Sequence, residues 1–262
     1  MMAWCQNDPR SDLFDADTSL TNFQRIVDEY PDSRFAAQAN YFVGLYYFDK
    51  NENEAALEFF EKATEMARPD LGEYDSLFEY ANYRLAWTHY LLNEYEEALA
   101  LFTQAQDYSI RKNNDTGQPS NTLEESLEYT ALSFADIADI ESRQAVEVAH
   151  EYYEKHGERE HTADVFVFMA DQLTQQVRIV EAMDTYSYLQ DHWPYSPDNP
   201  NYQKKLAELL LEDGELDGYY DAMALLTERY AENGDWWIQD MATMLPIYLT
   251  KEIKNKKVLD MC

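Results

Sequence analysis

The stretches ANYFVGLYYF, at positions 39–48, and ANYRLAWTHY, at positions 81–90, begin with the same three residues. Both continue with further aromatic residues, and their first residues are 42 positions apart. The same offset aligns Gly44 with Ala86, so a small residue follows the shared start in both stretches. A pattern that recurs at a fixed interval of about 20 to 50 residues indicates a repeat architecture.

The alignment extends into the segment after each stretch. At the same offset, Ala56 aligns with Ala98 and Phe60 aligns with Phe102. Two small residues at this spacing allow a pair of antiparallel helices to approach closely, and an aromatic residue one turn further on fills the space beside them. The pattern therefore predicts a helix–turn–helix unit in each copy.

Further copies of the pattern are found along the chain. The best-matched one consists of Ala170, Ala182, Tyr186 and Pro194, where the proline closes the unit. A weaker copy is centred on Ala207, the copy centred on Ser133 matches poorly, and a half unit around Phe23 precedes them all. We expect about five helix pairs, of which the first is incomplete and the third degenerate.

This order of small and aromatic residues resembles the tetratricopeptide repeat. The resemblance implies an all-α fold, a right-handed superhelical solenoid of antiparallel helix pairs that binds other proteins. The Tyr-Pro-x-Ser turn at positions 30–33 and the phrase LQDHWPYSP at positions 189–197 are similar to bacterial cell-envelope members. These include the repeat-bearing lipoprotein of the outer-membrane β-barrel assembly machine and the periplasmic coordinator of the Tol system. The resemblance implies an envelope or periplasmic location, with the cytoplasm as the alternative because no signal peptide is visible.

Three segments are expected along the chain. Residues 1–12 form a flexible N-terminus, residues 13–234 form the repeat array, and residues 235–262 form a capping helix with a basic end. Stacked repeats expose an apolar end unless something covers it, and Trp236, Trp237 and Leu245 could supply that cover. The basic end has four lysines among its last twelve residues.

The charge is strongly acidic, with 51 acidic and 20 basic side chains and a formal net charge of −31. Such a chain repels phosphate backbones and anionic membrane surfaces, so nucleic acid is not an expected partner. No stretch approaches the ~20 apolar residues of a membrane span, so membrane insertion is not expected either. The acidity fits a solvated exterior, adaptation to high salt or attraction of a basic partner. The predicted partner is a protein or a peptide, and the oligomeric state is left open.

The first helix of each pair lines the concave side of such a solenoid, so its free face is the expected binding surface. Spacings of three and four residues keep the members of each set on one stripe. The predicted partner-binding residues are Tyr41, Leu45 and Phe48 in the first full pair, and Tyr80, Tyr83, Trp87 and Tyr90 in the second. The matching set in the third pair is Leu127, Thr130, Phe134 and Ile137. An aromatic stripe is also typical of a core, so both interpretations stay open. No cluster of lysine and arginine is present to hold a partner's C-terminal carboxylate.

Signals for chemistry are weak. The histidines show no zinc-protease spacing, there is no glycine-rich phosphate loop, and no serine lies in a nucleophile elbow. We therefore predict no catalytic residue, no metal and no cofactor. The predicted function is a non-catalytic scaffold that takes a partner helix or extended peptide in an aromatic groove within a larger assembly. A peptide-sensing regulatory protein and an accessory subunit of an enzyme complex are the alternatives.

Overall fold

The computed structural model describes residues 16–68, 74–120 and 122–231, and these residues form eleven α-helices and no β-strand. The predicted all-α fold is therefore confirmed. The predicted flexible terminus at 1–12 and the capping helix at 235–262 lie outside the described residues. None of the described helices combines the length and the apolar character needed to cross a membrane.

The chain forms two units, Met1–Met169 and Ala170–Cys262. The helices of the first unit are α2 (Ala16–Glu29), α3 (Ala36–Asp49), α4 (Asn53–Ala67), α5 (Ser76–Leu91), α6 (Tyr95–Thr116), α7 (Leu123–Glu141) and α8 (Ala145–His156). The helix α9 (Thr162–Gln175) crosses into the second unit, which contains α10 (Ile179–His192), α11 (Asn199–Glu212), α12 (Leu216–Leu226) and the π-helical turn η1 (Thr227–Ala231).

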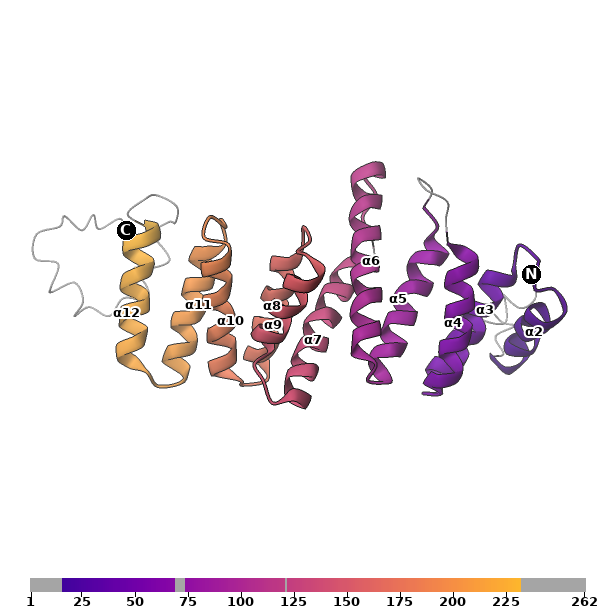
Figure 1. Cartoon of the computed structure of the whole chain (residues 1–262), viewed down its shortest axis with the longest axis horizontal. Coiled ribbons are helices and arrows are strands. Elements are labelled where there is room, and N and C mark those ends of the chain that lie inside the picture. The colour runs from indigo at the N-terminus through magenta and orange to yellow at the C-terminus, as the bar shows by residue number, and fades with distance from the viewer. Residues whose placement is uncertain (1–15, 69–73, 121, 232–262) are drawn as a thin grey trace, which may run out of the picture. The chain divides into compact units, whose positions relative to one another are not determined.

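Within the first unit, each helix packs on the next one in the chain, from α2 to α8 (Figure 1). The pairs are α3 with α4, α5 with α6, and α7 with α8. The first helices of these pairs also contact one another, α3 with α5 and α5 with α7. The first helices therefore lie next to each other and share one face of this unit, as expected for stacked helix pairs.

The small residues of the repeat lie where the two helices of a pair approach each other. A Cβ atom added to Gly44 would lie only 2.8 Å from Cδ1 and Cε1 of Phe60, so the ring occupies the space that a side chain would need. In the second pair, Ala86, Ala98 and Phe102 form one buried cluster. The close approach of the helices thus depends on these small side chains.

The turn inside each pair has a common backbone geometry. A residue with positive φ occurs at Asn51, Asn93, Val177 and Gly214, seven positions after Gly44, Ala86, Ala170 and Ala207 in that order. The residue after each of them donates its N–H to the carbonyl five positions earlier, at 2.9 Å in all four turns. This bond is the Schellman closure of a helix C-terminus. The same turn therefore recurs in four of the described pairs.

The third pair has the same turn geometry, but its small residue lies at a different position from the one the sequence pattern indicated. Its residue with positive φ is Ser142, which lies seven positions after Ala135, and Arg143 makes the equivalent bond to the carbonyl of Ala138 at 2.9 Å. The small residue of this pair is thus Ala135, and the assignment to Ser133 was wrong by two positions. The next helix also begins one residue later than in the other pairs, with Gln144 as its N-cap.

The helix α6 is longer than the sequence indicated. The polar run IRKNNDTGQPSN at positions 110–121 is typical of a loop, but α6 continues to Thr116. The extension brings Lys112 to the buried carboxylate of Glu79 on α5, where Nζ and Oε2 are 2.6 Å apart. Ser120 donates a hydrogen bond to the other oxygen of Glu79 at 2.6 Å. This ion pair stabilises the last turns of α6. Its acidic partner lies on α5, so the sequence of α6 alone does not indicate it.

Thr122 and Glu125 have the spacing of a capping box at the start of α7, but the structure does not show that arrangement. Thr122 is the N-cap residue, but its side chain makes no capping hydrogen bond. Its hydroxyl is instead directed into the buried polar cluster, 3.2 Å from the hydroxyl of Ser120 and 3.5 Å from Oε1 of Glu79. The buried carboxylate therefore competes with the helix N-terminus for this side chain.

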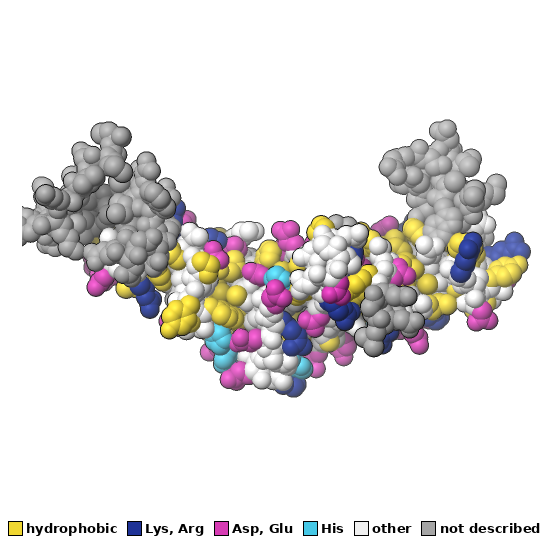
Figure 2. All heavy atoms as spheres, turned by 90° about the horizontal axis from the view of Figure 1, so that it is seen from above, with side chains coloured by type: hydrophobic (Ala, Val, Ile, Leu, Met, Phe, Trp, Pro, Cys, Tyr) yellow, Lys and Arg dark blue, Asp and Glu magenta, His cyan; other side chains and the backbone are white. Residues whose placement is uncertain are grey.

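Acidic side chains are distributed over much of the visible described surface, and basic ones are fewer (Figure 2). This distribution agrees with the excess of 51 acidic over 20 basic residues along the whole chain. The acidic side chains are thus spread over the face that Figure 2 shows.

Candidate protein-interaction face

The predicted partner-binding residues lie on the shared face of the first helices. We call this surface the aromatic face, and it consists of Tyr41, Leu45 and Phe48 on α3, Tyr80, Tyr83, Trp87 and Tyr90 on α5, and Tyr129 on α7. The structure brings the members from α3 and α5 together and adds Tyr129, which the sequence analysis did not include.

Trp87 is the central side chain of the aromatic face. Its ring centroid lies 5.1 Å from that of Phe48 on one side and 5.2 Å from that of Tyr129 on the other. Tyr90 continues the series, 5.4 Å from Tyr129. Aromatic rings attract each other at centroid separations of about 4.5 to 7 Å. The rings therefore form a continuous series across three helices.

Arg84 places a positive charge in the middle of this series. Its guanidinium carbon lies 4.8 Å from the ring centroid of Trp87, 5.3 Å from Phe48 and 5.9 Å from Tyr83. Such cation–π contacts are favourable. Among the residues that the structure describes, no carboxylate lies within ion-pair distance of Arg84. The face thus presents a cation held by rings in a chain that is otherwise strongly acidic.

The surroundings of Tyr41 and Tyr90 favour the neutral form of their hydroxyls by raising the pKa of each. Burial raises the pKa of Tyr41, and the nearby Arg84 opposes this rise. Burial also raises the pKa of Tyr90, and the hydrogen bond that its hydroxyl donates to Asp136, 2.6 Å long, raises it further. A neutral phenol can donate and accept hydrogen bonds. The face therefore combines apolar area with polar groups suited to a polypeptide backbone.

The members of the aromatic face differ in how deeply they are buried. Tyr83 is only 5% exposed and lies beneath the others, whereas Tyr80 is 38% exposed. Leu45, Phe48, Trp87 and Tyr90 are half-buried. Leu45 and Phe48 pack on the buried cluster around Phe60. These side chains contribute to the core with one side and present the other to solvent.

The binding stripe predicted on α7 was wrong, because the third pair is shifted in register relative to the other pairs. Leu127, Thr130 and Phe134 are all buried, and Phe134 is fully so. With Ala135 as the small residue, the position that matches Tyr80 is Tyr129, and the position that matches Trp87 is Asp136. The positive φ of Ser142 marks this register, but the sequence does not single out that serine.

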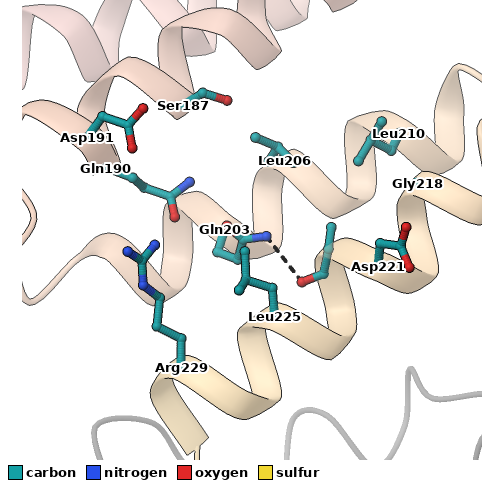
Figure 3. Close-up of a pocket in the computed structure, with 11 residues that line it drawn as sticks. Ser187, Gln190, Asp191, Gln203, Leu206, Leu210, Gly218, Asp221, Leu225 and Arg229 are labelled. Atoms are coloured by element: carbon teal, nitrogen blue, oxygen red, sulfur yellow. Dashed lines mark hydrogen bonds between the residues drawn. The ribbon is translucent and has the colours of Figure 1, made fainter.

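Two of the cavities are lined by residues that do not belong to the aromatic face. One of about 510 Å³ is bounded by α6, α7 and α8, and Ile137, which we had placed on the binding stripe, lines it. The other, of about 420 Å³, lies among α10, α11 and α12 in the second unit (Figure 3). Within the described ranges, no group of three His, Cys, Asp or Glu side chains is placed to hold a metal ion.

Comparison with known proteins identifies the repeat. The family model described as "Tetratricopeptide repeat" matches residues 37–70 and 79–109, which cover most of α3 to α6 but neither the first three residues of α5 nor the last turns of α6. The match is thus to two tetratricopeptide repeats within residues 37–109. The two matched copies contain both stretches on which the repeat was first recognised, together with the members of the aromatic face on α3 and α5. No curated protein matches the chain in sequence.

Several tetratricopeptide repeat proteins are among the solved structures that match the chain. The tetratricopeptide-like repeats of a putative kinesin light chain from Podospora anserina have 12% identity and a TM-score of 0.38, with 78% of this chain and 100% of that chain covered. YrrB, described as having an unusual peptide-binding site, has 14% identity and a TM-score of 0.37, covering 85% and 98%. PilF from Pseudomonas aeruginosa has 16% identity and a TM-score of 0.39, covering 88% and 90%.

Proposed function

We propose that this protein is a non-catalytic scaffold that binds a helix or an extended segment of a partner protein on the aromatic face. The observation that carries the proposal is the continuous series of rings from Phe48 through Trp87 to Tyr129. Tetratricopeptide repeats in the same part of the chain support it, because stacked helical repeats provide extended surfaces for binding other proteins.

The physical properties of the face suit a polypeptide ligand. Tyrosine and tryptophan are common anchors of protein interfaces, since they offer a large contact area together with a polar group. Their rings are already held by neighbours, as the tilted contact between Tyr83 and Trp87 at 6.1 Å illustrates. Less side-chain entropy is then lost when a partner binds. Grooves that receive a helix or an extended segment use such ordered side chains as pockets.

The test compares partner binding by three variants of the full chain. Partners are captured from the source organism by crosslinking and their affinity is then measured. Trp87→Ala and Tyr80→Ala are expected to weaken binding, for a central anchor by about 30-fold. Tyr195→Ala is the matched control, because Tyr195 is 97% exposed and is not a member of the aromatic face. Equal affinity in all three variants would show that the aromatic face does not bind the partner.

We also propose that the scaffold acts in an assembly of the bacterial cell envelope. This proposal is supported by the likeness of the Tyr-Pro-x-Ser turn, at positions 30–33, to the envelope members of the repeat family. Fractionation of the source organism tests it with an antibody against the chain. Recovery with envelope proteins agrees with the proposal, and recovery with the cytoplasmic fraction alone contradicts it.

A further inference from the structure

The second unit contains a groove that the aromatic face does not involve. It is the cavity of about 420 Å³ bounded by α10, α11 and α12, which is within the range of about 300 to 1,000 Å³ that is usual for ligand sites. Leu206 and Leu210 from α11 and Leu225 from α12 give it an apolar lining (Figure 3). Leu225 is 43% exposed, so part of this apolar surface is open to solvent.

The amide side chains of the groove hold its walls together. Gln203 donates a hydrogen bond from Nε2 to the carbonyl of Ala222, which is 3.1 Å away on α12 (Figure 3). Asn82 makes the equivalent bond to Leu101 at 3.2 Å in the second pair, because both donors lie four positions before the small residue and both acceptors lie 19 positions further on. The bond of Gln203 is thus part of the repeat, and the polar groups left for a ligand are the charged ones.

Two carboxylates face the leucines from different helices. Asp191 belongs to α10 and Asp221 belongs to α12, and Figure 3 shows them on different sides of Leu206. Both residues are exposed, and within the described part of the chain neither carboxylate has a hydrogen-bond or ion-pair partner. Arg229 is the basic residue among those lining the groove, and its guanidinium carbon lies 6.0 Å from the ring centroid of Tyr230.

We propose that this groove binds a lysine or arginine side chain of a partner polypeptide. These side chains consist of an aliphatic stem and a charged head, and they bury the stem on apolar surface while the head stays in a polar setting. The stem fits the leucine lining, and the charged head is placed at an edge of the groove, beside Asp191 on one side or Asp221 on the other. The net charge of −31 on the chain attracts basic segments to it over a longer range. The groove is separate from the aromatic face, so this proposal does not depend on the proposed function.

The test uses a defined peptide and two double variants of the full chain. The probe is a fluorescein-labelled Gly-Leu-Lys-Leu-Lys-Gly peptide, and its control is the same peptide with both lysines acetylated. Asp191→Asn with Asp221→Asn is expected to weaken binding of the lysine peptide about tenfold, since each partly exposed ion pair contributes modestly. Asp213→Asn with Asp217→Asn changes the net charge equally at exposed positions outside the groove and is expected to leave affinity nearly unchanged.

Three results would overturn the proposal. The first is equal binding of the lysine peptide and the acetylated peptide. The second is an equal loss of affinity in the two double variants, which would indicate attraction by the general charge alone. The third is loss of binding in Trp87→Ala, which would place the peptide on the aromatic face. Leu225→Ala adds a check on the apolar part, because it is expected to weaken both peptides without changing the charge.

Discussion

At the scale of single residues, the contact between Gly44 and Phe60 determines how closely α3 and α4 can pack. The ring lies 2.8 Å from the position of an added Cβ atom, so Gly44→Ala forces the ring or the helix to move. Overpacking of this kind usually costs about 1 to 3 kcal/mol. We expect Gly44→Ala to lower the free energy of unfolding by that amount in chemical denaturation.

A second substitution identifies the cause of this loss. Phe60→Leu makes room for the methyl group, so the double variant is expected to lose less stability than the two single losses together. Wild-type stability in Gly44→Ala would show that the close approach at this position is not required.

The buried ion pair between Glu79 and Lys112 gives a second prediction at this scale. The side chain of Glu79 is 3% exposed. Removal of Lys112 therefore leaves the carboxylate of Glu79 in the protein interior without an opposite charge. Lys112→Met is expected to reduce the free energy of unfolding by about 3 kcal/mol, measured by chemical denaturation. Replacing both residues, Glu79→Gln with Lys112→Met, should restore most of it. If the single variant proves as stable as the wild type, the ion pair does not anchor the extension of α6.

At the scale of helices and turns, the common geometry inside each pair accommodates very different residues. Glycine and asparagine tolerate positive φ, but Val177 adopts a φ of 62° with a branched side chain. Such a conformation costs about 1 to 2 kcal/mol for an ordinary residue and is unusual for a β-branched one. Val177 is 76% exposed, so its side chain gives little packing in return.

Val177→Asn is therefore expected to raise the melting temperature and to add about 0.5 to 1 kcal/mol to the free energy of unfolding. The matched control is Val180→Asn, an exposed valine in the first turn of α10, which should be neutral or slightly destabilising. A loss of stability in Val177→Asn would mean that the valine makes contacts that outweigh the backbone strain.

The elements that follow from local pattern could be predicted, and those that depend on distant contacts could not. The pairs around Gly44 and Ala86 follow from small residues at a regular spacing. The length of α6 does not, because its last turns are held by Glu79, which lies 33 residues before Lys112. The register of α7 was missed because Ser133 and Ala135 are both small, and only the turn at Ser142 distinguishes them.

At the scale of the whole molecule, the formal net charge of −31 over 262 residues opposes folding through repulsion between like charges. The Debye length, which is the distance over which salt screens charges, shortens from about 30 Å at 0.01 M salt to about 3 Å at 1 M. We therefore expect the melting temperature to rise as sodium chloride is added from low concentration and to level off at high concentration. A melting temperature that falls or stays constant would contradict this account, and a steady rise without a plateau would indicate an effect other than screening.

The most direct test of the central proposal is site-specific photocrosslinking of the full chain in the source organism. The crosslinking residue p-benzoylphenylalanine replaces Tyr80, which is 38% exposed on the aromatic face, or Gln104, which is exposed on α6 away from that face. We predict crosslinks from position 80 to another polypeptide, their loss when Trp87→Ala is added, and few crosslinks from position 104. Crosslinks that form at position 104 and not at position 80 would contradict the proposal that the aromatic face binds the partner.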